Sequence, residues 1–157
     1  MGLRKQREGF TLPNVAVVRS FTSTAAIIKN RVVKLAATGN IKHTTGTSGR
    51  AVLGVALAAA TGAGIKVPVQ LFGVVAIHAS TRALATGVYV RATSGAASTA
   101  SGLGGTVRAS TVAMTTALPI RANIVGYSLS SAAAAAAGTN RTVDVMLYPM
   151  ANNPALL

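Results

Sequence analysis

Hydrophobic and polar positions alternate most clearly between residues 51 and 80, where three short apolar runs follow one another. The runs cover residues 51–57, 65–72 and 74–78, and a single glycine, Gly73, separates the last two. In the middle run every second residue is aliphatic, and these residues share one face of a strand: Ile65, Val67, Val69 and Leu71. Short runs with β-branched residues and period-two alternation predict β-strands. Pro68 cannot donate a ladder hydrogen bond, which predicts that this strand lies at a sheet edge or beside a bulge.

The same pattern recurs later in the chain and indicates two similar halves. The matched segments, first half and then second half, are 32–36 with 88–92, 53–57 with 125–129, and 65–72 with 141–148. The register of the first match is open by one residue. Links of small residues, 58–64 and 130–140, connect the later segments. Two copies are too few for a solenoid, so we expect an all-β fold, a small β-barrel or β-sandwich built from the two halves.

The remaining segments complete this domain and its flanks. We expect residues 1–24 to form an extended basic N-terminal arm, residues 25–150 the barrel or sandwich domain, and residues 151–157 a C-terminal tail. Further strands are expected at 25–36 with a turn near Lys29 and Asn30, and at 88–92, 107–114, 122–129 and 141–148. Residues 38–49, rich in Gly and Thr, are expected to be a loop. The six alanines 132–137 are too few to hold a helix alone in water, so we expect a link with at most one helical turn.

Charge is the unusual feature of the composition. Fifteen Lys and Arg face only Glu8 and Asp144, which gives a formal net charge of +13 over 157 residues. Such a chain repels itself and favours a negative partner, whether nucleic acid, an anionic membrane or an acidic protein surface. Apart from the group at Arg4, Lys5 and Arg7 the basic residues occur singly. The alternative interpretation of scattered charges is simply the solvated face of a β-domain.

The sequence is poorly supplied with catalytic groups. Two carboxylates far apart argue against a paired acid and base, and with no cysteine there is little to hold a metal. His43, in a polar loop, and His78, at a strand end, are expected to be surface or core residues. No phosphate-binding glycine motif is present. The longest uncharged central run, residues 51–65, is shorter than the roughly 20 residues of a membrane-spanning helix. We therefore expect no enzyme activity, catalytic residue, metal, cofactor, small-molecule substrate or membrane partner.

A pattern of glycines and aliphatic residues carries a family resemblance. Its motifs, in chain order, are VVKL at 32–35, LGVA at 53–56, a small-residue link ending in Gly64, Val67 and Val69, GVV at 73–75, Ala79, and GVYV at 87–90. This pattern, spanning about residues 25–148, resembles the small capsid decoration (cement) proteins of tailed bacteriophages. The basic arm and the link 130–140 depart from that family.

The resemblance implies a virion structural protein on the outer surface of an icosahedral phage head. It would act as a homotrimer that binds the major capsid protein and stabilises contacts between its subunits. A +13 protein would be attracted to an acidic shell, and an arm that orders on its neighbour would add buried apolar area. We expect Arg4, Lys5, Arg7 and Phe10 of the arm to contact the capsid. The alternative hypothesis is nonspecific binding to the nucleic-acid backbone, although Trp is absent and the few aromatic residues do not alternate with basic ones in the sequence.

Overall fold

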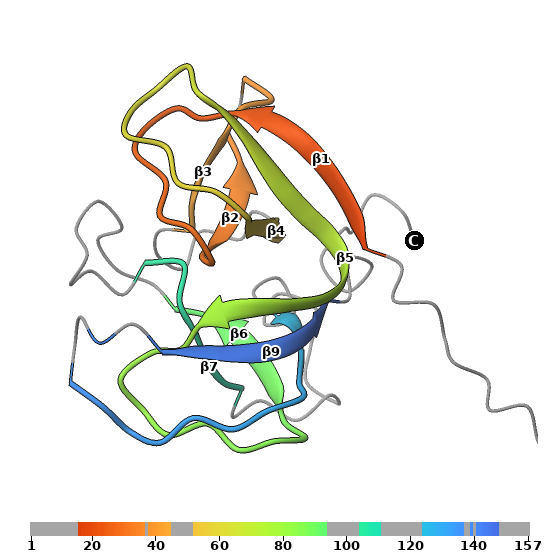
Figure 1. Ribbon diagram of the computed structural model, residues 1–157, viewed down its shortest axis with the longest axis vertical. Coiled ribbons are helices and arrows are strands. Elements are labelled where there is room, and N and C mark those ends of the chain that lie inside the picture. Colours follow the sequence, from red (N-terminus) through yellow and green to blue (C-terminus); the bar gives the residue numbers. More distant parts are fainter. Residues whose placement is uncertain are drawn as a thin grey trace, which may run out of the picture.

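The computed structural model describes residues 16–36, 38–44, 52–93, 104–110, 124–136, 139 and 141–147. Within these ranges the fold is all-β without a helix, which confirms the fold class expected from the alternation. The strands, in chain order (Figure 1), are β1 Val17–Thr22, β2 Val32–Leu35, β3 Ile41–His43, β4 Val52–Ala56, β5 Lys66–His78, β6 Tyr89–Ala92, β7 Val107–Ala109, β8 Ile124–Ser128 and β9 Thr142–Leu147.

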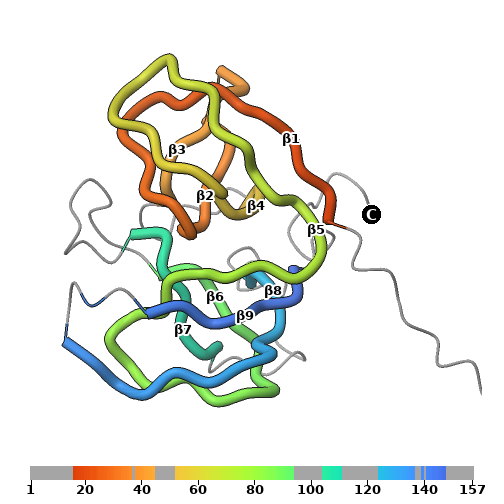
Figure 2. Tube along the Cα trace, in the orientation of Figure 1, coloured from red at the N-terminus to blue at the C-terminus, as the bar shows by residue number. Residues whose placement is uncertain are grey.

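The long strand β5 joins two parts of one antiparallel sheet (Figures 1 and 2). Its first part pairs with β1 and β4, and its second part, from Gly73 onwards, pairs with β9. Gly73 has a φ of 93°, a backbone conformation that residues with a side chain rarely adopt. The buried Gln70 amide donates to the carbonyls of Phe72 (3.1 Å) and Val74 (2.9 Å), one on each side of Gly73. The two apolar runs separated by Gly73 in the sequence are therefore one continuous strand, bent at the glycine.

The sheet divides at Gly73 into two halves of the same design. We call β1–β4 with β5 up to Phe72 the first half, and β5 from Gly73 with β6–β9 the second half. The strand order β3-β2-β4-β5-β9-β8-β6-β7, with β1 beside β5, repeats the same pairings in each half. In Figure 1 the first half forms the upper lobe and the second half the lower lobe.

The pairing registers show which residues correspond between the halves. Gly54 on β4 matches Gly126 on β8, because each faces the last strand of its own half at the same place. The ladder from β2 to β4 shifts register after Val33, and the ladder from β6 to β8 shifts after Val90. Val33 therefore corresponds to Val90, and residues 32–35 of β2 match residues 89–92 of β6. This settles the register that the sequence left open, because the match begins at residue 89 and not at 88.

Each half curls around its own apolar core. A parallel bridge links the first strand of each half to its third, Ser23 to Ile41 in the first half and Ala79 to Val107 in the second. The first core consists of Ile27, Val33, Ile41, Ala56, Ala60, Val67 and Val69. The second consists of Val75, Ile77, Ala79, Leu84, Val90, Ala92, Val107, Val125, Val143, Val145 and Leu147, together with two residues of the first half. The molecule is therefore two small barrel-like units in series.

Those two residues mark the place where the halves meet, which we call the junction. Val32 and Val55 are fully buried but pack into the core cluster of the second half, and Leu57 packs against the same cluster. The backbone N–H of Val32 donates to the carbonyl of Gly105 at 2.7 Å across the junction. The part of the outer face of the first half that carries Val32, Val55 and Leu57 is thus covered by the second half.

The sheet begins earlier than the sequence led us to expect. Residues 1–24 were expected to be an arm, but Val17–Thr22 forms β1, which pairs with β5 from Phe72 to Lys66. The first four residues of β1 are exposed, and Arg19 interrupts their apolar pattern, so the segment resembles a polar arm in the sequence. The start of the expected arm, residues 1–15, and the expected tail at 151–157 lie outside the described residues.

Of the two positions expected for the strand of Pro68, the sheet edge is wrong, whereas a register shift does occur in its ladder with β1, where Val17 and Val18 face Phe72 and Gln70. Pro68 lies opposite Ser20 of β1, while on its other side its carbonyl accepts the N–H of Leu57 at 2.9 Å, so β5 has neighbours on both sides here. The β4–β5 ladder ends at the pair of Ala56 and Val69. The missing proline N–H therefore falls just beyond the last ladder pair, where it disrupts no sheet bond.

The loop expected at 38–49 is also wrong in part, because Ile41–His43 forms β3 and Ile41 is fully buried. The expected turn near Lys29 is confirmed, and Asn30 adopts a φ of 60° there. The link through the alanines contains no helical turn among residues 130–136, and Ala132 instead bridges to Leu84.

Candidate functional site

Two arginines face each other on the outer side of the second half. Arg91 of β6 and Arg108 of β7 are paired in register, while their neighbours Val90 and Val107 point into the core. Directly opposed residues in an antiparallel pair have Cβ atoms roughly 5 Å apart, and like charges there destabilise the sheet. The Nε atoms of both arginines are buried and have no hydrogen-bond partner among the described residues. The pair concentrates positive charge on one place of the surface.

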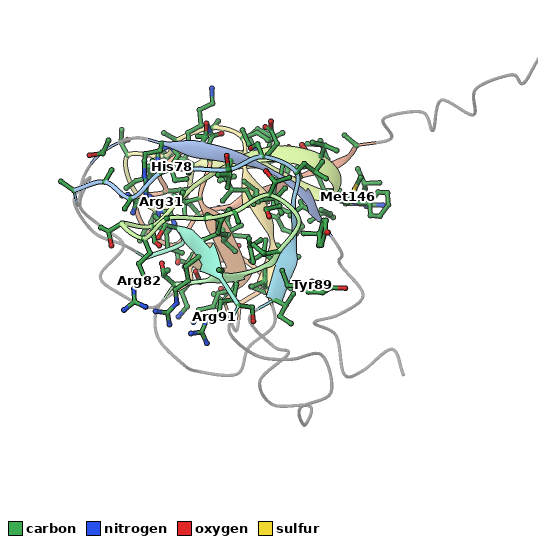
Figure 3. The ribbon with its side chains drawn as sticks, turned by 90° about the horizontal axis from the view of Figure 1, so that it is seen from below. Arg31, His78, Arg82, Tyr89, Arg91 and Met146 are labelled. Atoms are coloured by element: carbon green, nitrogen blue, oxygen red, sulfur yellow. The ribbon has the colours of Figure 1, made fainter. Side chains whose placement is uncertain are left out.

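A third arginine adds to this charge. Burial lowers the pKa of Arg108, and the charges of Arg91 and then Arg82 lower it further, so the three guanidinium groups lie close enough to repel. Figure 3 shows Arg82 and Arg91 on the same side of the molecule. The side chain of Arg141 donates to the carbonyls of Ser80 and Arg82, which holds the segment carrying Arg82 against β9. We call Arg82, Arg91 and Arg108 the arginine cluster.

The first half carries a basic pair at the corresponding place. Lys34 of β2 is paired in register with Lys42 of β3, as Arg91 is with Arg108. Lys34 is only 4% exposed, whereas Arg91 and Arg108 are both partly exposed. With fifteen basic residues and two carboxylates, the chain cannot neutralise most of its own charge. Lys42 is partly exposed too, so the arginine pair differs in that both of its members are open to a partner.

Aromatic side chains lie next to the arginine cluster. Tyr89 precedes Arg91 by two residues on β6, so both point outward, and Tyr89 is paired in register with Tyr127 of β8. The two tyrosine rings form an edge-to-face contact with centroids 5.5 Å apart and an interplanar angle of 75°. This geometry is a favourable one for aromatic pairs. The outer face of the second half is therefore apolar beside its charged edge.

A second group of titratable residues lies at the junction. Arg31 is 3% exposed, and its guanidinium donates to the carbonyl of Gly104 at 3.1 Å. His43, also 3% exposed, accepts the backbone N–H of Ile28 at its Nε2 (2.9 Å), which requires a neutral ring with the proton on Nδ1. Burial and then the charge of Arg31 lower the pKa of His43 to about 4, against the opposing effect of the Val32 backbone. The same two causes lower the pKa of His78.

The charge of the junction group disfavours a bound cation. The buried Arg31 guanidinium, whose charge lowers the pKa of both His43 and His78, repels a cation, and no group of three or more His, Cys, Asp or Glu able to hold a metal occurs in the described part of the chain. The sequence placed His43 in a polar loop, whereas the structure places it in the buried strand β3. Within the same ranges, no helix is long and apolar enough to cross a membrane.

The contacts expected from the sequence and those visible in the structure lie in different parts of the chain. Arg4, Lys5, Arg7 and Phe10 lie outside the described residues. The arginine cluster was not singled out from the sequence, where its members are isolated basic residues. The available signal was the alternation at 90–92 and 107–109, which puts an arginine on the outer face of each strand; the register that pairs them is not visible in the sequence.

No protein-family model matches the chain, and neither a curated protein nor a solved structure matches it significantly.

Proposed function

We propose that the chain is a structural protein of a phage virion, a decoration protein that binds the outer surface of the capsid. The observation that carries the proposal is the arginine cluster. Two arginines directly opposed on neighbouring strands, with a third nearby, destabilise the isolated sheet. Carboxylates of a partner would remove this repulsion on binding, so the cluster favours an acidic protein surface.

Two further features support a capsid rather than another acidic partner. The glycine and aliphatic pattern that resembles the decoration proteins coincides with the duplicated strands, including Gly54 of β4 and Gly73 at the bend of β5. A decoration protein must also resist mechanical load without chemistry, which agrees with a β-fold of a chain that has only two carboxylate side chains and two histidines. As a homotrimer bound to the major capsid protein, it would present three arginine clusters, and their combined avidity would exceed the affinity of one.

The test is co-sedimentation with empty phage heads that lack the protein. The variants are Arg91→Gln with Arg108→Gln, and the chain shortened to begin at Ala16, just before β1. A matched control, Arg19→Gln with Lys66→Gln, removes the same charge from exposed positions of the first half. We expect the arginine double variant to bind about tenfold more weakly and the control to bind as the unaltered protein does. If the arginine double variant and the control double variant lose the same affinity for heads, overall charge and not the arginine cluster accounts for the binding. Failure of the unaltered protein to bind heads would refute the proposal.

The second candidate function is binding to the nucleic-acid backbone, favoured by Tyr89 and Arg91 side by side on the outer face of β6. Stacking on an aromatic ring beside a cation is how single strands are held without sequence preference. The deciding result is tight binding to DNA in the absence of binding to heads. That affinity would fall steeply with salt, and Tyr89→Ala would weaken it for single strands more than for duplex.

A further inference from the structure

The second half exposes the counterpart of the face that the first half buries at the junction. The correspondence of the halves matches Val32, Val55 and Leu57 of the first half with Tyr89, Tyr127 and Leu129 of the second. Val32 is fully buried, whereas Tyr89 is 38% and Leu129 is 44% exposed. We call Tyr89, Tyr127 and Leu129 the open face. Seven large hydrophobic residues of the described chain are strongly exposed, and two of them lie on this face.

The first half exposes the counterpart of the other side of the junction. The second half covers the first with the end of its barrel that carries Ala92, which is 9% exposed, and Gly105. A Cβ added to Gly105 would lie 2.7 Å from the Val32 carbonyl, so this turn is in close contact. The matching residues of the first half are Leu35, which is 41% exposed, and Gly39, which has nothing within 4 Å of an added Cβ. We call Leu35 and Gly39 the open end.

We propose that copies of this chain associate head to tail, the open end of one copy docking on the open face of the next. The occupant is a second copy because, within one chain, the junction already binds the counterparts of these two surfaces to each other. The contact is heterologous: the two surfaces differ, so each copy uses one for each neighbour, and the assembly closes into a ring or continues as a filament. The proposal does not rest on the capsid function and is tested without heads.

Charge gives this association a distinctive dependence on salt. The contact surfaces are apolar, while each copy carries a net charge of +13 and repels the next. Salt screens that repulsion over roughly 10 Å at 0.1 M. Self-association should therefore strengthen as salt rises, whereas binding of the arginine cluster to an anionic partner should weaken. The two processes are thus separated by one titration.

The test is sedimentation velocity of the full chain over a concentration series. Leu35→Arg blocks the open end, Tyr89→Arg blocks the open face, and Ile65→Arg is the matched control, since Ile65 is 37% exposed and belongs to neither surface. We expect the unaltered protein and the control to associate and each single blocked variant to remain monomeric. An equimolar mixture of the two blocked variants should form a 1:1 dimer, because each retains the surface that the other has lost.

Three results would overturn the proposal. They are a monomeric unaltered protein at every concentration and salt, a Leu35→Arg variant that still dimerises alone, and a mixture of blocked variants that stays monomeric. The second result would indicate a symmetric contact between two open faces. Circular dichroism of each variant checks the fold. If either arginine variant is unfolded, the two single variants Leu35→Ser and Tyr89→Ser are used in their place.

Discussion

Acid should destabilise this protein chiefly through the junction histidine His43. Its neutral ring accepts the N–H of Ile28 at 2.9 Å, and protonation of Nε2 would set an N–H against an N–H in a site that is 3% exposed. Burial is the main cost of a charged His43 ring, and repulsion by the charge of Arg31 adds to it. His78 is less buried than His43, and the same two causes, burial and then the charge of Arg31, lower its pKa as well.

The sign and the size follow from linkage. Between pH 6.5 and about 4 the unfolded chain binds a proton at His43 that the folded chain does not, so stability falls as pH drops through this window and levels off below it. A pKa of about 4 against an ordinary value of 6.5, at about 1.4 kcal/mol for each tenfold change, amounts to a loss of ~3 kcal/mol. This is a large part of the total for a domain whose stability is about 5–15 kcal/mol.

The assay is urea unfolding at pH 7 and at pH 4.5 for the unaltered protein, His43→Gln and His78→Gln. The chain has only two carboxylate side chains, so ordinary acid titration contributes little to this comparison. Glutamine keeps an acceptor for the Ile28 N–H but does not titrate, so His43→Gln should lose much less stability over this range than the unaltered protein. An equal loss in both, or an NMR titration that places the pKa of His43 at its ordinary value, would refute the reasoning.

Two further substitutions test packing in the duplicated frame. Gly126→Ala should destabilise the fold by about 2–3 kcal/mol in urea unfolding, because its Cβ would collide with the backbone carbonyl of the facing strand; Gly62→Ala, with open space around it, should be nearly neutral, and similar losses in both would contradict the argument. Ser128→Ala should cost about 1–2 kcal/mol by the same measure. The fully buried Ser128 hydroxyl has one proton to donate, either to the carbonyl of Ala85 (2.8 Å) or to that of Val88 (3.0 Å). Ser130→Ala removes one exposed acceptor and should cost less than half as much, so an equal cost would argue against the buried network.

The parts of the fold predictable from sequence are those in which local pattern and packing agree. The aliphatic alternation around Val67 and Val69 follows from a strand with one buried face, and both residues are fully buried. The repeated glycine at 54 and 126 is visible because each close approach of neighbouring strands excludes any side chain. The strands that were missed are β1, whose outer residues are exposed, and β3, which has only three residues. Neither presents enough alternation to be separated from a loop.

The candidate site was less predictable because it depends on contacts between distant segments. Arg91 and Arg108 become neighbours through the register of β6 and β7, which no local pattern encodes. In the sequence His43 lies among threonines and glycines, which indicates a loop. In the structure the first half curls around it, with Arg31 close by, and the side chain is buried. The predicted contacts at Arg4, Lys5, Arg7 and Phe10 remain predictions, since they lie outside the described residues.

Comparing the halves locates where function should be carried. They share strands, bridges and glycines, so differences at corresponding positions are not demanded by the fold itself. In the first half these positions hold Val32, Val55 and Lys34, all of them buried, and the junction buries the two valines. In the second half the same positions hold Tyr89, Tyr127 and Arg91, which meet solvent instead. The outer face of the repeated sheet thus packs the halves together in the first half and is free for recognition in the second. Substitutions on the outer face of the second half should therefore alter binding. Equivalent changes in the first half should alter stability.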